Sequence, residues 1–431
     1  MLQKEHDALL LELFDARQAL EETRRELSQA LYQNDAAVRV ISRLVMERDA
    51  AHAKLQNIAP QQLQTAQAQP QPMEVEADEP SNSNTIGEAD MSIMVDTWKK
   101  LSKTRKKRAV AKDYPQFDAI STFSSVDTKS NLHKTNKPGS TCLTAVPKTK
   151  LVVSGGNDKT AVVYDGVAEK VVGKLTGHSK AVTSVDAIDD LIVTGSPDGS
   201  ARCYRVCEAD GNKSFEFIGS YSIDGFAACA GVCIHPTGKY VLVASVLGKI
   251  AFCSVSRSSE DENAVKELAV FDTETAVTCI GMHPDGLILG AGTADGKLKI
   301  LDLKSQKFAS TLEGHKGAVT SLSFSENGYH FSSSSDAGEV NVWDLRKLKL
   351  MKTLTCDGAA FQVQFDYSGK NLAYTSGNGV TVCVVKDWEK SVELTSAHKD
   401  AVMGIVWSLD GQWIASAGKD RNLVLWGAAQ E

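Results

Sequence analysis

Apolar residues recur every seven positions in the first 57 residues of this chain. The segment has no glycine or proline and is rich in Leu, Ala, Glu, Arg and Gln, which favour helices. We therefore predict a coiled-coil helix that self-associates; a single amphipathic helix docked on the rest of the chain is the alternative. The polar Asn34 lies on the same track, as register-fixing residues do. The expected oligomerisation seam contains Leu13, Leu20, Leu27, Leu31, Val38 and Ile41.

Residues 58–98 lack this periodicity and are rich in Gln, Pro, Ser and acidic residues, which predicts a linker. A basic segment, 99–114, follows. It opens with ten residues that hold seven bases and no acid. Such a run is typical of a nuclear-localisation signal or a nucleic-acid patch, and a solvated helix face is the alternative. The nuclear-localisation candidates are Lys99, Lys100, Lys103, Arg105, Lys106, Lys107 and Arg108.

Short runs rich in Val, Ile and Thr, separated by Gly, Asp and Asn, occupy most of residues 115–431 and predict strands. Seven of these runs can be superimposed, and their aligned positions are Tyr164, Tyr204, Cys253, Leu301, Trp343, Val384 and Trp426. A period of about 40 to 45 residues, with strands that end in an aromatic residue and Asp, is the signature of WD40 blades. Residues 115–431 therefore resemble the WD40 family. The predicted fold is mainly β, a seven-bladed propeller with four strands per blade, preceded by the coiled coil and a disordered linker.

Closure of this propeller requires a strand from elsewhere in the chain. The residues after Trp426 are too few to form the fourth strand of the seventh blade, and an open sheet edge invites aggregation. We predict that Ala119–Ser125 supplies the strand as an N-terminal latch. Two polar insertions, 208–214 and 257–264, are expected to form loops that can contact partners.

The WD40 resemblance also implies structural hydrogen-bonded tetrads. In that family a His before a blade, a Ser or Thr on its second strand, an Asp in the following turn and a Trp on the third strand bind one another. We expect a full tetrad in blade seven, Tyr204 in place of Trp in blade two, a loosened set in blade five because Ala337 occupies the Asp position, and none in blades three and six. His133 stands alone before the first repeat. The expected tetrad residues are His398, Ser416, Asp420 and Trp426; His178, Thr194, Asp198 and Tyr204; and His315, Ser333 and Trp343.

Composition and motifs argue against catalysis and for an intracellular protein. The 47 basic and 54 acidic residues give a net charge of −7, which disfavours a general nucleic-acid-binding surface. The charged start of the chain and the short apolar runs predict neither a signal peptide nor a membrane helix. Nine cysteines without a CxxC pair are expected to be buried small hydrophobic residues, so neither a metal nor a cofactor is expected. The His/Ser/Asp sets do not indicate a hydrolase, because they recur blade after blade without a GxSxG motif.

Coiled coil and propeller together resemble the pre-mRNA-processing factor 19 family. The resemblance covers nearly the whole chain and is carried by residues 24–44, 132–139, 283–296, 323–329 and 342–349. It implies a nuclear, spliceosome-associated scaffold in pre-mRNA splicing. Such a scaffold forms a tetramer through its coiled coil and binds other spliceosomal proteins through coiled coil and propeller.

Members of this family also carry an N-terminal U-box, which binds a ubiquitin-conjugating enzyme and makes them E3 ubiquitin ligases with a link to DNA repair. Met1 begins where the coiled coil begins, and no U-box-like segment is recognised in this sequence. We therefore expect a scaffold, and the alternative is a U-box E3 ubiquitin-protein ligase whose U-box is missing from this chain. A ubiquitin-conjugating enzyme is an expected partner only with a U-box restored. Neither a membrane nor direct nucleic-acid binding is expected.

Overall fold

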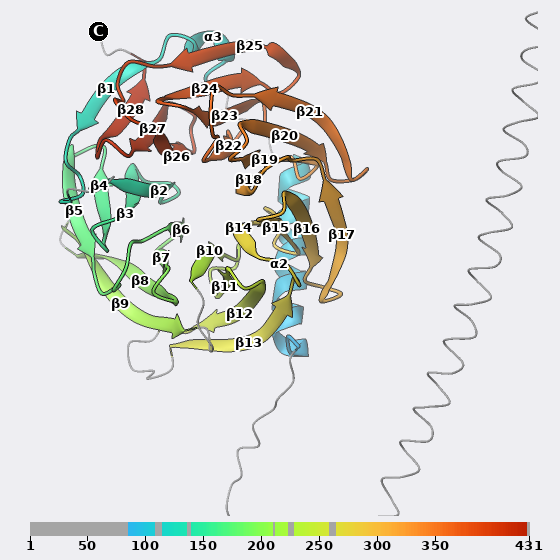
Figure 1. Ribbon diagram of the computed structural model, residues 1–431. Helices are drawn as coiled ribbons and strands as arrows, with labels where there is room; N and C mark the ends of the chain where they lie inside the picture. The colour runs from blue at the N-terminus through green and yellow to red at the C-terminus, as the bar shows by residue number, and fades with distance from the viewer. Residues whose placement is uncertain are drawn as a thin grey trace, which may run out of the picture. The chain divides into compact units, whose positions relative to one another are not determined.

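The computed structural model describes residues 85–107, 114–135, 139–209, 212–222, 228–257 and 264–428. The coiled coil predicted for residues 1–57 lies outside these ranges. The described helices are α2 (Glu88–Lys107) and α3 (Phe117–Ile120), and neither is long and apolar enough to span a bilayer. All described strands belong to seven four-stranded antiparallel sheets, so the predicted seven-bladed propeller is confirmed (Figure 1).

The blades follow one another along the chain, each built from consecutive strands. Blade 1 contains β2 (Ser140–Ala145), β3 (Leu151–Gly156), β4 (Ala161–Asp165) and β5 (Lys170–Leu175). Blade 2 contains β6 (Ser184–Ile188), β7 (Leu191–Ser196), β8 (Ser200–Ala209) and β9 (Asn212–Ser222). Blade 3 contains β10 (Cys229–Ile234), β11 (Tyr240–Ser245), β12 (Lys249–Val255) and β13 (Val265–Asp272). Blade 4 contains β14 (Val277–Met282), β15 (Ile288–Thr293), β16 (Lys297–Asp302) and β17 (Lys307–Glu313).

The remaining three blades repeat this order, except that the last one is completed by the first strand of the chain. Blade 5 contains β18 (Val319–Phe324), β19 (His330–Ser335), β20 (Glu339–Asp344) and β21 (Lys349–Thr355). Blade 6 contains β22 (Val363–Phe365), β23 (Asn371–Ser376), β24 (Gly379–Val384) and β25 (Asp387–Leu394). Blade 7 contains β26 (Val402–Trp407), β27 (Trp413–Gly418), β28 (Leu423–Gly427) and β1 (Ser124–Lys129).

The second strand of each blade is buried almost throughout, because neighbouring blades cover both of its faces. Strands β3, β7 and β11 are buried at every position. A strand covered on both faces reads as a continuous run of apolar and small residues instead of an alternating one. Small residues are required where blades converge: a Cβ on Gly155 of blade 1 would lie 2.9 Å from Val182 Cγ1, just before β6, and one on Gly292 of blade 4 would lie 2.6 Å from Val319 Cγ1 of β18. The repeats are therefore shaped by packing between blades.

Side chains on the innermost strands bind the backbone of the next blade. Ser184 and Asp186 of β6 accept hydrogen bonds from two amides of β10, at 3.0 and 2.7 Å. Gln362 and Gln364, around β22, accept hydrogen bonds from two amides of β26, at 2.9 and 3.0 Å. These strands surround a channel of about 790 Å³. Burial raises the pKa of Asp186 to about 6, although two amide hydrogen bonds oppose the rise. Polar side chains thus join consecutive blades around the channel.

Ring closure depends on a strand far from the last blade in sequence. Strand β1 pairs antiparallel with β28, from Ser124 opposite Gly427 to Lys129 opposite Leu423. The predicted latch is thus present, but it begins later than the predicted Ala119–Ser125, since Ala119 and Ile120 belong to α3. The difference has a packing cause, because Ile120 and Phe123 are buried in the core shared by blades 6 and 7.

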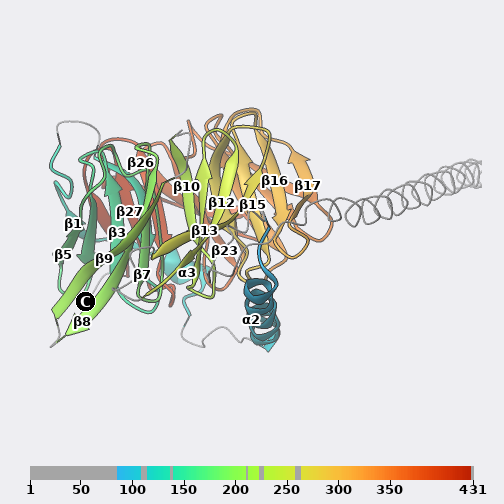
Figure 2. The same cartoon turned by 90° about the horizontal axis from the view of Figure 1, so that it is seen from below.

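Helix α2 was not expected, because residues 88–98 were assigned to the linker. Its Met94 is fully buried in a core cluster of blades 3 and 4, and Met91 packs against the same cluster. Met91, Met94, Val95, Trp98 and Leu101 recur at helical spacing and form one face of the helix. Figure 2 shows the helix against one face of the propeller, near β15 and β16.

The nine cysteines form no disulfide. Six are buried, and Cys142, Cys207 and Cys356 are half-buried. Burial raises the pKa of Cys203 and of Cys279 to about 12, which keeps both thiols protonated and unreactive at neutral pH. They act as small hydrophobic residues, as expected from the sequence.

Replacing Ile120 with Ala tests whether the N-terminal segment holds the ring closed. The side chain is fully buried against blade 7, so we expect a loss of about 2 to 5 kcal/mol in the free energy of unfolding. Val126→Ala is the matched control, because Val126 is half-exposed on β1. Urea denaturation measures both, and equal midpoints for the two variants would contradict the role of this segment.

Candidate functional site

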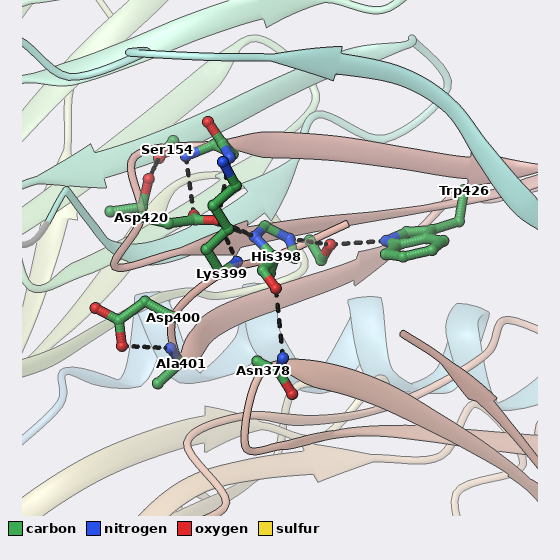
Figure 3. A network of polar contacts seen from close by, with 11 residues as sticks. Ser154, Asn378, His398, Lys399, Asp400, Ala401, Asp420 and Trp426 are labelled. Atoms are coloured by element: carbon green, nitrogen blue, oxygen red, sulfur yellow. Dashed lines mark hydrogen bonds and ion pairs between the residues drawn. The ribbon is translucent and has the colours of Figure 1, made fainter. Parts of the chain in front are cut away.

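A complete hydrogen-bonded tetrad lies in blade 7 (Figure 3). His398 precedes β26, Ser416 is on β27, Asp420 is in the turn after it and Trp426 is on β28. His398 Nδ1 lies 3.1 Å from Asp420 Oδ1 and Nε2 lies 2.8 Å from Ser416 Oγ. Trp426 Nε1 donates to Ser416 Oγ at 2.7 Å. The structure therefore brings together all four residues named from the sequence.

One proton arrangement satisfies every member of this network. His398 Nδ1 donates to Asp420, Nε2 accepts the Ser416 hydroxyl proton, and the serine oxygen accepts the indole proton. Burial alone would raise the pKa of Asp420, but hydrogen bonds from His398 and from the Lys399 and Asn422 amides bring it below its ordinary value. Ser416 is fully buried, so its hydroxyl is not open to a substrate. The network is suited to fixing the turn and loop of the blade.

Blade 2 has three of the four expected partners. His178 Nδ1 lies 2.9 Å from Asp198 Oδ2, and Nε2 lies 2.8 Å from Thr194 Oγ1. Tyr204 does not complete the set, since its hydroxyl donates to the Thr176 carbonyl at 2.9 Å. A phenol hydroxyl lies at the far end of its ring, beyond the position of an indole nitrogen. Tyr204 therefore ties the loop to the blade directly.

Blade 5 replaces the missing aspartate with a glutamate that the sequence analysis did not identify. His315 Nε2 lies 2.6 Å from Ser333 Oγ, to which Trp343 Nε1 donates at 2.9 Å. Glu339 accepts the Lys316 amide at 3.2 Å, and its Oε2 lies 4.0 Å from His315 Nδ1, which accepts a hydrogen bond from Asn341 Nδ2 at 3.3 Å. The glutamate side chain of Glu339, one methylene longer than aspartate, extends toward the histidine from β20. Burial lowers the pKa of His315 to about 4. A Glu at the start of the third strand is the sequence signal for this replacement.

Blade 1 contains a set that the sequence analysis missed. His133 Nδ1 and Nε2 lie 3.0 Å from Asp158 Oδ1 and from Ser154 Oγ. Thr160 also donates to Asp158, at 2.7 Å. In the sequence His133 stands isolated before the first repeat. The folded chain brings it to the same place as the other histidines.

These networks share one face of the propeller, and helix α2 lies on the other. The tetrad turns join second and third strands; we call the face made by the other turns, between first and second and between third and fourth strands, the lower face. Gln306, between β16 and β17, binds the backbone of Ile86 just before α2, at 2.8 and 3.2 Å. Tyr240 donates to Asp90 at 2.7 Å. Arg105 pairs with Asp285 in the turn after β14, at 2.8 Å.

The basic run is therefore divided between two environments. Arg105 is largely buried in its ion pair, whereas Lys99, Lys100 and Lys103 are exposed. Lys106 and Lys107 end the helix, and Arg108 lies outside the described residues. For the three exposed lysines, the structure is that of a solvated helix face.

The first insertion differs from the expected loop. Residues 208–209 and 212–214 extend β8 and β9 into a long hairpin, because the two strands continue to pair beyond the blade, out to Ala209 opposite Asn212. Residues 258–263 of the second insertion lie outside the described ranges. In the part of the chain that the structure describes, no three His, Cys, Asp or Glu side chains gather as a metal site.

Fold and networks define a WD-repeat propeller protein, and the comparisons with known proteins agree. The sequence matches the Prp19/Pso4-like family over residues 1–58 and the WD domain, G-beta repeat over residues 169–205, 265–302, 306–344 and 389–427. It is 34% identical to Pre-mRNA-processing factor 19 homolog 2 of Arabidopsis thaliana, over 99% of this chain and 82% of the relative. It is 36% identical to Pre-mRNA-processing factor 19 of Bos taurus, over 98% and 84%. The chain belongs to the Pre-mRNA-processing factor 19 family.

Replacing Glu339 with Ala tests the substitute partner in blade 5. The change leaves the Lys316 amide without its acceptor and removes the carboxylate that lies 4.0 Å from His315 Nδ1, so we expect a loss of about 1 to 3 kcal/mol in the free energy of unfolding. Asp336→Ala is the matched control, since Asp336 is exposed in the same turn. Urea denaturation compares the two. A larger loss for Asp336→Ala than for Glu339→Ala would show that Asp336 is the acidic member of the blade 5 network.

Proposed function

We propose that this chain is a scaffold subunit of a spliceosome-associated complex in pre-mRNA splicing. The observation that carries the proposal is the similarity to proteins named Pre-mRNA-processing factor 19, which spans 98 to 99% of this chain and 82 to 84% of the first relatives. Because that similarity includes both the N-terminal segment and the propeller, it concerns the whole arrangement of domains. A WD repeat match alone would indicate only a fold.

The geometry of the described residues supports binding over catalysis. The His/Ser/Asp sets are buried and use their polar atoms on one another. A ring of seven sheets closed by β1 presents turns and outer strands in fixed positions. Rigid surfaces of this kind lower the entropy cost of holding several partners. The chain is thus suited to assembling a complex.

Self-association through the N-terminal helix is part of this proposal. The seven-residue track of Leu13, Leu20 and Leu27 is the supporting pattern, and a tetramer is the expected state. Four propellers joined in one particle would present four copies of every partner-binding surface, which raises avidity without any new contact.

Leu20→Ala with Leu27→Ala tests the oligomer and the scaffold together. Each change removes a large side chain from the seam at about 2 to 5 kcal/mol, so we expect a monomer by light scattering after gel filtration. Gln18→Ala with Arg25→Ala, off the seam, should stay oligomeric. Recovery of spliceosomal small nuclear RNAs with the tagged wild-type chain from nuclear extract tests the splicing role. A monomeric wild-type chain would refute self-association, and a wild-type chain that recovers none of these RNAs would refute the splicing role.

Nuclear entry is proposed to use the exposed part of the basic run. Lys99→Ala, Lys100→Ala and Lys103→Ala remove three exposed charges and leave the Arg105–Asp285 pair intact. We expect the tagged triple variant to shift to the cytoplasm in fluorescence images of cells. Alanine at Lys129, Lys170 and Lys386, three exposed lysines of the propeller, is the matched control. An unchanged nuclear signal in the first variant would reject the role of this run.

A further inference from the structure

A groove runs between helix α2 and the lower face of blades 4 and 5. It has a volume of about 280 Å³. Two aromatic side chains on its wall are partly exposed, Trp98 of α2 at 36% and Tyr329 of the β18–β19 turn at 39%. Other wall residues are Leu287, Ile288, Leu345 and Arg346. The wall thus combines aromatic, aliphatic and guanidinium groups, the types that contribute most to binding energy at protein interfaces.

The charged groups of the groove are held in place from within. Arg346 Nε and Nη2 donate to Asp344 at 3.3 and 2.9 Å, and the guanidinium carbon lies 4.6 Å from the centre of the Tyr329 ring. Arg105, paired with Asp285, lies 5.8 Å from the same ring. Asp285 of the groove and the neighbouring Asp344 are therefore each paired with an arginine of this chain. Side chains fixed in this way lose little entropy on binding.

The outer strand of blade 5 continues this surface with apolar and basic residues. Leu348, Leu350 and Met351 are exposed at 39, 42 and 50%, although they are large and hydrophobic. Lys347, Lys349 and Lys352 alternate with them, and the described residues contain no ion pair to any of the three. Two fourth strands, β5 and β21, include no acid; Lys174 of β5 pairs with Asp158 at 3.5 Å, whereas the lysines of β21 have no such partner among the described residues. The surface is therefore both apolar and positive.

Protection of an open sheet edge explains the lysines but not the residues between them. Edge lysines prevent strand-to-strand aggregation, and exposed Leu and Met have the opposite effect. Leu348 also has a positive φ of 51°, a conformation unfavourable for a side chain of this type. Gln306 occupies the equivalent turn of blade 4 with a φ of 56°, and it binds the backbone of Ile86. The same corner thus holds a chain segment in blade 4 and is exposed in blade 5.

We propose that this surface, which we call the blade-5 surface (Trp98, Tyr329, Arg346, Leu348, Leu350 and Met351), binds an acidic, partly aliphatic segment of a partner protein. Carboxylates of the segment meet Arg346 and the three lysines, and its aliphatic side chains enter the groove. An extended segment can also add to the edge of β21 through backbone hydrogen bonds. RNA fits less well, because Trp98 and Tyr329 can stack on bases but Leu348, Leu350 and Met351, half of the surface, offer no stacking surface. The inference rests on the proposed scaffold role, since it describes the chemistry of one of its partners.

Fluorescence anisotropy with the full-length chain tests the proposal. The probe is a fluorescein-labelled synthetic peptide of alternating Leu and Glu, compared with Ser/Glu and Leu/Lys peptides and with labelled oligouridylate. We expect only the Leu/Glu peptide to bind. Arg346→Ser should weaken its binding by about tenfold or more. Leu350→Ser with Met351→Ser should also weaken it, and these exposed side chains can change without unfolding the blade. Lys170→Ser on β5, another exposed lysine on an outer strand, is the matched control.

Oxidative footprinting locates the peptide on the chain. Trp98 and Met351 should be protected when the peptide is bound. Equal affinity in the wild-type and substituted chains, tighter binding of oligouridylate, or no peptide binding below ~1 mM would overturn the proposal. These measurements use the purified chain and a synthetic peptide. A chain that binds the peptide but recovers no spliceosomal RNA would therefore reject the splicing role alone.

Discussion

The pairing of β1 with β28 is the contact on which the propeller depends. It joins residues 124–129 to residues 423–427 and gives the seventh sheet its fourth strand. The second strand of each blade is buried by the blades on either side. Separating two neighbouring blades would therefore expose the apolar faces of both at once. The segment that makes the closure also buries Ile120 and Phe123 against blades 6 and 7. Closure and core packing are therefore one event.

Once the ring is closed, buried polar groups need partners, and the histidine networks provide them. Blades 1, 2, 5 and 7 place an imidazole between a hydroxyl and a carboxylate. The chemical need is constant, since an unpaired buried donor or acceptor costs about 1 to 3 kcal/mol. The residues that meet it vary, because Glu339 reaches the position of an aspartate from the next strand and Tyr204 binds a loop carbonyl directly. Conservation of geometry, and not of residue type, characterises these sites.

Helix α2 connects the basic run to the lower face of the propeller. One side of the helix is held by Met94 and by the Arg105–Asp285 pair, and the opposite side carries exposed lysines. The same helix contributes Trp98 to the blade-5 surface. The proposed partner binding at that surface and the proposed recognition of the lysines would therefore involve neighbouring residues of one helix.

The sequence by itself determined the propeller, because a repeat of about 40 to 45 residues with strand chemistry fits few architectures. It also identified all four members of the blade 7 tetrad, whose spacing and residue types follow the family pattern. Only the tertiary structure decided the site of α2, the start of β1 at Ser124, the recruitment of Glu339 and the partners of His133. Each of these depends on contacts between residues far apart in the chain or on the reach of one side chain, such as Gln306 with Ile86. Local patterns specify which elements form and which faces are apolar. Packing in three dimensions decides which face contacts which other part of the chain. A difference of one methylene or of one residue in register changes these contacts.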